Sequence, residues 1–347
     1  MFELLDQYQV KELHVRDDAG SGLKAFIAIH NTQFGPALGG CRFIEYDNET
    51  QAIQDVISLA RGMSYKAALA GVPQGGGKAV IMKPRGEFDP HKLFTEFGRF
   101  VESLGGQYIT AIDSGTTANE MDIIQGATSF VTSTSEAGNP SAYTAKGVFE
   151  GIKAAVKFKL GKDDLTGIKV AVQGLGSVGY SLCEKLHNAG AELIVTDINQ
   201  VALDKAAAEL NATVVGLDEI YSQDVDVFSP CALGASIDDN TIPQLKAVII
   251  AGCANNQLAE ARHDQILLEK GILYAPDYVI NAGGIINVAL EIYPEPYCAD
   301  SATKLVENIY HTLMNVFETA AAQNMPTGLI ADQMARDIIA KGHNNSN

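Results

Sequence analysis

Two lysines twelve residues apart are the side chains best suited to do chemistry in this sequence. Lys66 lies near the end of an apolar-periodic segment at 52–69, and Lys78 follows three consecutive glycines, Gly75–Gly77. Glycine admits positive φ and lets a ligand approach the backbone closely. Loss of solvation among apolar residues and repulsion from a second ammonium both lower the pKa of a lysine. The stretch therefore suggests that Lys78 is a neutral base facing a small ligand, although an exposed loop lysine is the simpler interpretation of this stretch alone.

The elements around these lysines alternate between strands and helices, which is typical of an α/β layer. We expect strands at 11–17, 23–31, 78–83 and 107–111, and helices at 52–69, 91–104 and 118–127. The segment 33–42 holds so much Gly and Pro that we expect no regular element there. Its Gly39 and Gly40 offer a second place for close approach of a ligand. A cluster of Ser, Gly and Pro at 133–141 predicts a hinge between two domains.

The clearest local pattern is a strand at 168–173 that runs into a glycine-rich turn and a helix. The residues that define the turn are Gly174, Gly176, Ser177, Val178 and Gly179. The first glycine makes the turn, the second admits a pyrophosphate, and the third lets helix and strand pack closely. A second strand ends at Asp197, eighteen residues after Gly179, where an acidic side chain binds ribose hydroxyls. Because this carboxylate would repel a 2′-phosphate, the pattern predicts NAD rather than NADP.

Later parts of the sequence continue a doubly wound sheet. We expect strands at 225–229 and 247–251, and helices at 301–323 and 327–341. Gly and Asn gather after later strands, at 230–234, 252–256 and 280–284, where such sheets hold ligands. Cys231 lies in the first of these loops, and no histidine lies in its segment. We therefore interpret Cys231 as a small buried residue rather than as a nucleophile.

The composition excludes several classes of function. The 347 residues suffice for two domains, and 46% hydrophobic with 19% charged residues indicates a compact protein. A net charge of -17 argues against nucleic acid or another polyphosphate as a partner. We expect neither a signal peptide nor a membrane span, because the sequence lacks a sustained apolar run. Five scattered cysteines predict free thiols and a cytoplasmic protein, and histidines that never pair at i, i+4 predict no metal site.

Motifs spread along the chain resemble those of the amino acid dehydrogenases, in the branch that acts on leucine, valine and phenylalanine. They are GPALGG at 35–40, RGMSYKAALAG at 61–71, GGGKAVI at 75–81, DSGTT at 113–117, TAKGV at 144–148, VQGLGSVG at 172–179, SPCALG at 229–234, AGCANNQL at 251–258 and PDYVINAGG at 276–284. The resemblance covers essentially the whole chain. It implies an α/β fold of two domains with a cleft between them, and a homo-oligomer, either a dimer or an octamer.

The resemblance also implies where the domains lie. A substrate-binding and oligomerisation domain would take 1–135 together with the C-terminal helix at about 326–347. A Rossmann-type NAD-binding domain would take 140–325.

The same resemblance implies roles for single residues. Lys66 pairs with the substrate α-carboxylate, Lys78 activates water, and Asp113 exchanges protons with the amino group. The remaining implied positions are Gly39, Gly40, Met63 and Asn256 for the substrate, and Thr144, Cys231, Ala232, Asn255 and Asn281 for the cofactor. The family commonly has Glu-Asp-Val before its Gly-Thr-Thr, whereas this chain has Ile112-Asp113-Ser114. The immediate surroundings of the aspartate therefore differ from those in the family.

Four apolar positions bear on the identity of the substrate. Glutamate-specific relatives have a lysine at the position of Leu38 and a serine at that of Val288. In this chain neither residue can pair with a side-chain carboxylate, and burying one unpaired costs several kcal/mol. Ala111 is expected for branched aliphatic substrates, whereas relatives that accept aromatic side chains tend to have glycine there. With Ile285 as the fourth pocket residue, we expect NAD-dependent, reversible oxidative deamination of leucine, isoleucine and valine to the 2-oxo acid and ammonia.

Two other functions stay open at this point. One is an aromatic L-amino acid dehydrogenase for phenylalanine or tryptophan, with the same mechanism and a roomier pocket. The other is a non-catalytic protein that binds NAD and senses an amino acid. A sensor needs no base, so the presence of Lys66, Lys78 and Asp113 together favours an enzyme.

Overall fold

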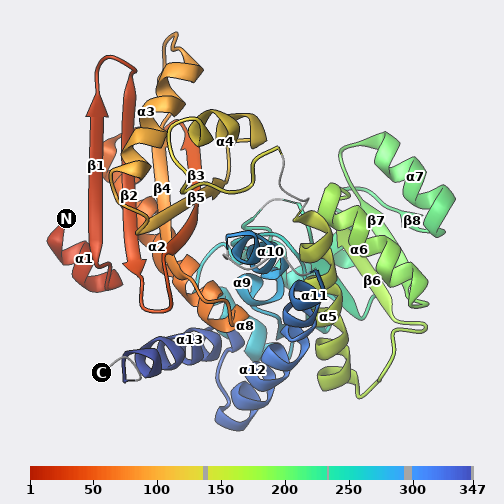
Figure 1. The fold of residues 1–347 in the computed structure, drawn as a ribbon. Coiled ribbons are helices and arrows are strands. Elements are labelled where there is room, and N and C mark those ends of the chain that lie inside the picture. Colours follow the sequence, from red (N-terminus) through yellow and green to blue (C-terminus); the bar gives the residue numbers. More distant parts are fainter. Residues whose placement is uncertain (136–139, 233, 293–298, 345–347) are drawn as a thin grey trace. The chain divides into compact units, whose positions relative to one another are not determined.

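Two separate β-sheets organise the chain, one in each of two structural units (Figure 1). The computed structural model describes residues 1–135, 140–232, 234–292 and 299–344. Of these, the N-terminal unit takes 1–135, 288–292 and 335–344, and the C-terminal unit takes 140–232, 234–287 and 299–334. This division differs from the expected domain boundaries in two places. Residues 288–292 group with the N-terminal unit, and the C-terminal segment joins that unit from 335 instead of 326.

The N-terminal sheet has the strand order β1-β2-β4-β3-β5. Its strands are β1 (Glu12–Asp18), β2 (Leu23–Asn31), β3 (Ala37–Ile44), β4 (Gly75–Met82) and β5 (Tyr108–Ile112). The pairs β1–β2 and β2–β4 are antiparallel, whereas β3 pairs in parallel with β4 and β5. The expectation that 33–42 forms no regular element is wrong, because β3 lies in the interior of the sheet.

Helices cover both faces of this sheet: α1 (Phe2–Tyr8), α2 (Glu49–Ala70), α3 (Pro90–Glu102) and α4 (Ala118–Gln125). Apolar residues of α2, among them Val56 and Ala60, pack on one face against Phe26 and Val80. Residues of α3 and α4 pack on the other face against β2 to β5. The Asn48 side chain accepts a hydrogen bond from the Gln51 amide at the start of α2 (3.0 Å), and this cap fixes where the helix begins.

The glycines of β3 and β4 make room for neighbouring protein backbone. A Cβ on Gly75 would lie 1.8 Å from the Asn31 carbonyl oxygen, and one on Gly76 would lie 2.1 Å from the Ser64 amide nitrogen. A Cβ on Gly39 would lie 1.8 Å from the carbonyl oxygen of Gly77. These glycines belong to strands and have no positive φ, so β4 begins at Gly75, three residues before the expected start of the strand at 78. The absent side chains of these glycines let α2 and the strands approach each other closely.

The C-terminal sheet is entirely parallel and has the order β11-β10-β9-β6-β7-β8. Its strands are β6 (Lys169–Gln173), β7 (Glu192–Thr196), β8 (Thr213–Val214), β9 (Val227–Pro230), β10 (Ile249–Ile250) and β11 (Leu273–Tyr274). The order reverses between β6 and β9, which makes the carboxyl ends of these two strands the switch point of a doubly wound sheet. The fold class predicted from the sequence is confirmed.

The helices of the second half of the chain are α5 (Ser141–Leu160), α6 (Ser177–Asn188), α7 (Gln200–Leu210), α8 (Arg262–Glu269), α9 (Asp277–Ile280), α10 (Gly283–Glu291), α11 (Ala299–Glu307), α12 (Ile309–Gln323) and α13 (Thr327–Asn344). Short 3₁₀ helices lie at Ile220–Ser222 and Ile242–Gln244. The single helix expected at 301–323 is two helices, α11 and α12, which meet at Asn308. None of the helices in the described ranges is long and apolar enough to cross a membrane.

Candidate functional site

One face of the N-terminal sheet carries the residues predicted to act on a substrate. Leu38 on β3 pairs with Gly76 on β4, and Gly40 on β3 pairs with Ala111 on β5. Because side chains alternate along a strand, Lys78 lies on the same face as Gly76, and so do Leu38, Gly40 and Ala111. Helix α2 covers this face, since Val80, two residues after Lys78, packs against α2. Strand register thus places the predicted base beside the predicted apolar pocket.

Lys78 is buried and forms an ion pair with Asp113. Its side chain is 7% exposed, and Nζ lies 2.9 Å from Asp113 Oδ2. Asp113 follows β5 directly, at the carboxyl end of that strand. The same carboxylate oxygen accepts a hydrogen bond from Arg42 Nε at 3.1 Å. Two cations from two neighbouring strands therefore share one carboxylate oxygen.

The charges around Asp113 decide its protonation state. Burial disfavours the anion, but the charges of Lys78 and Arg42 and their hydrogen bonds outweigh burial, so the pKa of Asp113 lies below its ordinary value. Two neutral neighbours respond in the opposite sense: burial and the Asp113 charge raise the pKa of the Cys41 thiol, and burial raises that of the Tyr108 hydroxyl. Asp113 is therefore an anion at neutral pH, within a hydrogen bond of a proton donor.

The turn after β5 fixes the backbone of Asp113. The Asp113 amide donates to Thr116 Oγ1 (2.9 Å), and that hydroxyl donates to the Cys41 carbonyl oxygen (3.0 Å). Gly115 has φ 84, a conformation that favours glycine, and a Cβ there would lie 1.9 Å from the Phe43 carbonyl oxygen. The Asp-Ser-Gly-Thr segment thus ties the end of β5 to β3. This arrangement restricts where the carboxylate can move.

Two predicted pocket residues lie on the same face of the N-terminal sheet, and both are buried. Leu38 is 1% and Ala111 8% exposed. Met63 and Lys66 lie on α2, one turn apart. Val288 belongs to the N-terminal unit, where the neighbouring Ala289 carbonyl accepts a hydrogen bond from Gln74 Nε2 (2.9 Å). Ile285 is buried in the C-terminal unit, so its place in the pocket stays a prediction.

Arg42 and the residues that hold it were not predicted from the sequence. Arg42 Nη1 lies 2.8 Å from Asp55 Oδ2, and the Tyr46 hydroxyl donates to the same oxygen at 2.5 Å. Burial and the bond to Asp55 raise the pKa of Tyr46. Had 33–42 been assigned as a strand, alternation would have placed Arg42 on the face of Gly40. Nothing in the local sequence indicates that Asp55, on α2, reaches this strand.

The C-terminal unit provides the geometry expected of a dinucleotide-binding turn. Gly174 has φ 101, and its amide donates to the Thr196 carbonyl oxygen (2.8 Å). A Cβ on Gly179 would lie 2.1 Å from the Gly174 carbonyl oxygen, whereas one on Gly176 would meet no atom within 4 Å. The first and third glycines are thus required by packing, and the second leaves open space at the amino end of α6, where Ser177 and Val178 begin the helix. Such a space fits a pyrophosphate group.

Asp197 lies directly after β7 and contacts the same turn. Its carboxylate accepts hydrogen bonds from the amides of Leu175 (2.5 Å) and Asn199 (2.7 Å). The side chain therefore links the glycine turn to the end of β7. Each carboxylate oxygen has a second lone pair, so Asp197 can also accept hydrogen bonds from a ribose.

The other predicted cofactor residues gather near the carboxyl ends of β6, β9 and β10. A Cβ on Gly174 would lie 2.8 Å from the Ala232 amide nitrogen, and one on Gly179 would lie 3.3 Å from Cys231 Cβ. Asn281 Nδ2 donates to Asn255 Oδ1 (2.8 Å) and to the Cys253 carbonyl oxygen (3.1 Å).

Two further predicted positions lie beside these loops of the C-terminal unit. Thr144, on α5, lies beside Gly284. A Cβ on Gly284 would lie 2.8 Å from Thr144 Oγ1. Asn256, predicted to contact the substrate, is exposed and has φ 51. The structure thus brings most of the predicted cofactor residues to one edge of the sheet.

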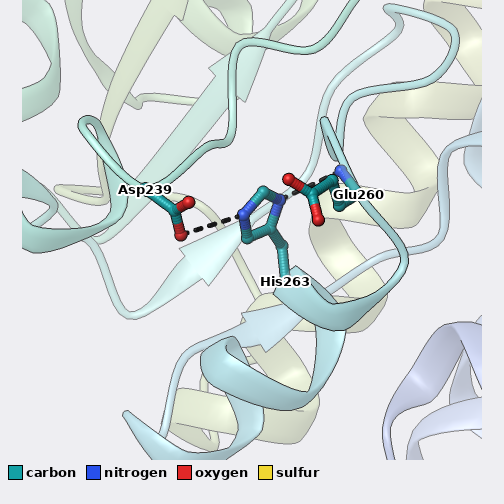
Figure 2. Close-up of side chains that lie close together, drawn as sticks. All are labelled: Asp239, Glu260 and His263. Carbon is teal, nitrogen blue, oxygen red and sulfur yellow. Dashed lines mark hydrogen bonds and ion pairs between the residues drawn. The ribbon is translucent and has the colours of Figure 1, made fainter.

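A second polar cluster, in the C-terminal unit, has ligand types that suit a metal ion. Asp239, Glu260 and His263 bring their oxygen and nitrogen atoms within 4.8 Å of one another (Figure 2). His263 Nδ1 accepts a hydrogen bond from the Glu260 amide (3.1 Å), so Nε2 carries the proton and faces Asp239 Oδ1 (3.3 Å). Both imidazole nitrogens are therefore used within the protein.

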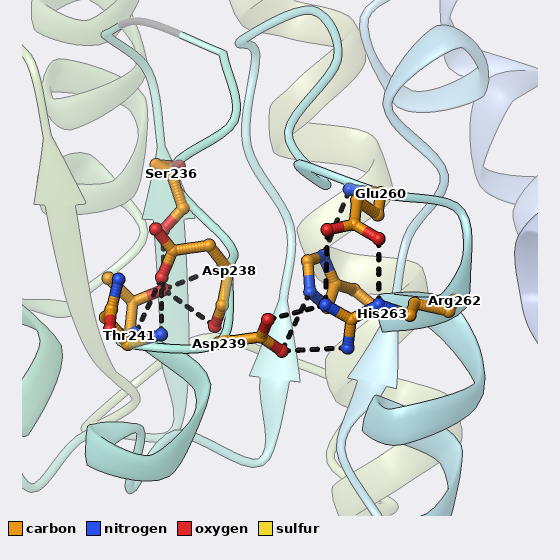
Figure 3. A network of polar contacts seen from close by, with 8 residues as sticks. Ser236, Asp238, Asp239, Thr241, Glu260, Arg262 and His263 are labelled. Carbon is orange, nitrogen blue, oxygen red and sulfur yellow. Dashed lines mark hydrogen bonds and ion pairs between the residues drawn. The ribbon is translucent and has the colours of Figure 1, made fainter.

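A cation from the protein already neutralises this cluster. Arg262 contacts both oxygens of Asp239, with Nη1 2.9 Å from Oδ1, and its Nε lies 2.8 Å from Glu260 Oε2 (Figure 3). The neighbouring Asp238 carboxylate accepts hydrogen bonds from the amides of Asn240 and Thr241 and from the Thr241 hydroxyl. The cluster thus fixes a loop against the start of α8, and we assign it no metal.

Comparisons with known proteins agree with this geometry. Residues 7–130 match the family model described as the Glu/Leu/Phe/Val dehydrogenase dimerisation domain. Residues 195–337 match the model described as Glutamate/Leucine/Phenylalanine/Valine dehydrogenase.

Several amino acid dehydrogenases align with nearly the whole chain. The leucine dehydrogenase of Bacillus subtilis (strain 168) is 50% identical over 98% of this chain and 94% of its own length. That of Geobacillus stearothermophilus is 50% identical over 98% and 93%. The crystal structure of L-tryptophan dehydrogenase from Nostoc punctiforme superposes with a TM-score of 0.90 at 44% identity, covering 99% of this chain and 100% of that one. The chain belongs to the Glu/Leu/Phe/Val dehydrogenase family and is an amino acid dehydrogenase.

Proposed function

We propose that the chain catalyses the reversible, NAD-dependent oxidative deamination of L-amino acids with branched aliphatic side chains. The products are the 2-oxo acid, ammonia and NADH. The observation that carries this proposal is the buried Lys78–Asp113 pair, with 2.9 Å between Nζ and Oδ2, on the sheet face that also bears Leu38 and Ala111. An acid–base pair beside an apolar surface suits a substrate with a reacting amine and an aliphatic side chain.

The residues of the chain divide the chemistry between them. NAD, when bound, supplies the hydride acceptor. Lys66 holds the substrate α-carboxylate by a charge-assisted hydrogen bond. Asp113 takes a proton from the substrate ammonium before the hydride leaves and later returns it to the nitrogen that departs as ammonia. Lys78, after releasing its own proton to solvent, accepts a proton from the water that attacks the iminium carbon. The hydrogen bond between Lys78 and Asp113 gives the proton a direct path between them, as two successive proton transfers require.

The cofactor would bind at the turn of the C-terminal unit. The open space beside Gly176 admits the pyrophosphate, and Asp197 accepts hydrogen bonds from the adenosine ribose. The carboxylate would repel a 2′-phosphate, which supports NAD over NADP. The N-terminal match is to a dimerisation domain, which supports a homo-oligomer, either a dimer or an octamer.

In the N-terminal unit, the side-chain pocket would include Leu38, Ala111 and Val288. An apolar pocket leaves a side-chain carboxylate without a partner, which disfavours glutamate by several kcal/mol. One methylene changes binding by only about 1–3 kcal/mol, so leucine, isoleucine and valine should all be turned over, within about two orders of magnitude of one another. Ala111→Gly should enlarge the pocket and raise activity with phenylalanine relative to leucine.

A substrate panel tests this proposal. Formation of NADH is followed by absorbance with leucine, isoleucine, valine, phenylalanine, tryptophan and glutamate, each with NAD and with NADP. We expect branched aliphatic substrates and NAD to give the highest kcat/KM. Preference for phenylalanine or tryptophan over every aliphatic substrate would favour an aromatic amino acid dehydrogenase, a function suggested by the similarity to the tryptophan enzyme. Binding of NAD and leucine without turnover would instead favour a sensor.

A further inference from the structure

Arg42 bridges two carboxylates that come from different elements. Its Nε lies 3.1 Å from Asp113 Oδ2, after β5, and its Nη1 lies 2.8 Å from Asp55 Oδ2, on α2. The side chains of Arg42, Asp113 and Asp55 are 18%, 20% and 27% exposed. A guanidinium presents several N–H groups in a fixed plane, so two anchored carboxylates determine its orientation. Asp55 therefore fixes one end of the Arg42 guanidinium, and the other end contacts Asp113.

Charges alternate along a chain of contacts that begins at the proposed base. Lys78 contacts Asp113, Asp113 contacts Arg42, and Arg42 contacts Asp55. Tyr46 ends the chain by donating its hydroxyl to Asp55. Partly buried charges are stable when each is paired and hydrogen-bonded, and each ion in this chain has a partner of opposite sign. A change at one end alters the surroundings of the other.

The groups that act on Asp113 come from every element packed against it. Lys78 approaches from β4 and Arg42 from β3. Cys41 on β3 and Tyr108 on β5 are neutral, because burial raises the pKa of each. Glu120 on α4 is bonded to the amide and hydroxyl of Thr117. Both cations contact Oδ2, so among the described residues Oδ1 is the oxygen left to face a substrate amine.

We propose that Arg42 is a positioning residue for Asp113, and that Asp55 and Tyr46 position Arg42. This inference rests on the proposed function, in which Asp113 exchanges a proton with the substrate amine. Arg42 fixes one oxygen of the carboxylate and points the other away from the strand. It also supplies a second positive charge that keeps Asp113 ionised. Lys78 can then take part in proton transfer without being the sole support of the carboxylate.

The test compares Arg42→Gln with a matched control, Arg16→Gln. Arg16 forms an ion pair with Glu96 at 3.0 Å in the same unit, and it lies on β1, which β2 and β4 separate from β3. The pKa of Asp113 is measured by carbon NMR on protein labelled at the aspartate carboxyl, and Asp113→Asn identifies the signal. Removing a cation within hydrogen-bond distance disfavours the anion, so Arg42→Gln should raise the pKa of Asp113 by about one to two pH units. Arg16→Gln should leave it unchanged.

The second readout is the pH profile of kcat/KM with leucine and NAD. In Arg42→Gln the acidic limb should move to higher pH, and kcat should fall about 10- to 100-fold through misplacement of the carboxylate. Arg42→Lys keeps the charge but cannot reach both carboxylates, so the limb should return toward its wild-type position while kcat stays low. An unchanged Asp113 pKa and acidic limb in folded Arg42→Gln would overturn the proposal.

Two milder variants keep the test decisive if Arg42→Gln does not fold. Asp55→Asn and Tyr46→Phe leave Arg42 in place and loosen its support, so kcat should fall about threefold to tenfold, with the larger loss for Asp55→Asn. Wild-type kcat in both would overturn the supporting role of Asp55 and Tyr46. If the wild-type protein turns over no amino acid, the proposed function fails, but the NMR measurement still decides whether Arg42 controls Asp113.

Discussion

Asp113 is a partly buried carboxylate of one unit and Asp264 a buried carboxylate of the other, and their pKa values move in opposite directions. Asp264 on α8 is 8% exposed and accepts a hydrogen bond from the Gly328 amide (2.9 Å). Burial raises its pKa to about 6, and nearby Asp332 adds to the effect. Asp113 is also largely buried, but Lys78 and Arg42 hold its pKa below the ordinary value. Burial alone thus favours the neutral acid, and two shared cations reverse that preference.

The difference separates a structural carboxylate from a chemical one. Asp264 fixes the start of α13 by accepting a backbone hydrogen bond, which either protonation state can do. Asp113 must be an anion that can accept a proton and return it. With a pKa of about 6, Asp264 is mostly ionised at pH 7 as well, so the contacts of Asp113 with Lys78 and Arg42, rather than its charge alone, distinguish the two carboxylates. We expect substitutions at the two positions to have different consequences, and the following predictions rank them by size.

The largest effect is expected for Asp113→Asn. The amide cannot accept a proton, so kcat should fall about 10²- to 10⁴-fold. The change also removes the anion shared by Lys78 and Arg42, which should lower the free energy of unfolding by about 1–3 kcal/mol. Steady-state kinetics and urea denaturation measure the two effects. A variant with near-normal kcat would show that Asp113 is not part of the proton transfer.

Asp264→Asn should leave turnover intact and change how stability depends on pH. In the wild type the folded pKa of about 6 exceeds the unfolded value of 3.8, so the folded chain holds this proton more tightly. The stability from this group is fully present below pH 3.8 and is lost as pH rises through about 6, by at most about 3 kcal/mol. The free energy of unfolding of both proteins is measured from pH 4 to 7.5. If the difference between them does not vary with pH, the assigned protonation of Asp264 is wrong.

Asp197→Ser tests the cofactor side of the account. The change relieves repulsion of a 2′-phosphate while a hydroxyl can still hydrogen-bond the ribose, so the preference for NAD over NADP should narrow by about tenfold. The carboxylate also accepts hydrogen bonds from the Leu175 and Asn199 amides, so kcat/KM with NAD should fall as well. Kinetics with both cofactors provide the comparison. Equal use of NAD and NADP by the wild type would contradict the role given to Asp197.

The smallest effect is expected for Arg262→Gln. Arg262 holds two carboxylates, as Arg42 does, but its side chain is 49% exposed, and water screens exposed ion pairs. The melting temperature should change by less than about 4 °C, and kcat should not change. Differential scanning calorimetry and the leucine assay measure both. A loss of turnover as large as that in Arg42→Gln would show that exposure does not distinguish the two arginines.

Local patterns predicted some regions of the molecule well. The dinucleotide turn was predictable because each glycine has its own steric reason, and β2 lies at the expected residues 23–31. β3 was not predicted because Gly and Pro argue against a strand. Its glycines are needed because a Cβ there would clash with the carbonyl oxygens of Gly77 and Ile112 on the neighbouring strands. The bonds from Arg42 to Asp55 and Asp113 join residues far apart in sequence, which no local pattern can indicate.

In the proposed function the N-terminal unit carries the proton-transfer residues and the C-terminal unit binds the cofactor, and Lys78→Ala tests this division most directly. NAD affinity is measured by isothermal titration calorimetry, and kcat is measured on the same preparation with leucine. If Lys78 takes the proton from water while the glycine turn binds the cofactor, kcat should fall about 10²- to 10⁴-fold and the Kd of NAD should stay within about twofold. Near-normal turnover, or loss of NAD affinity in parallel with turnover, would contradict the account.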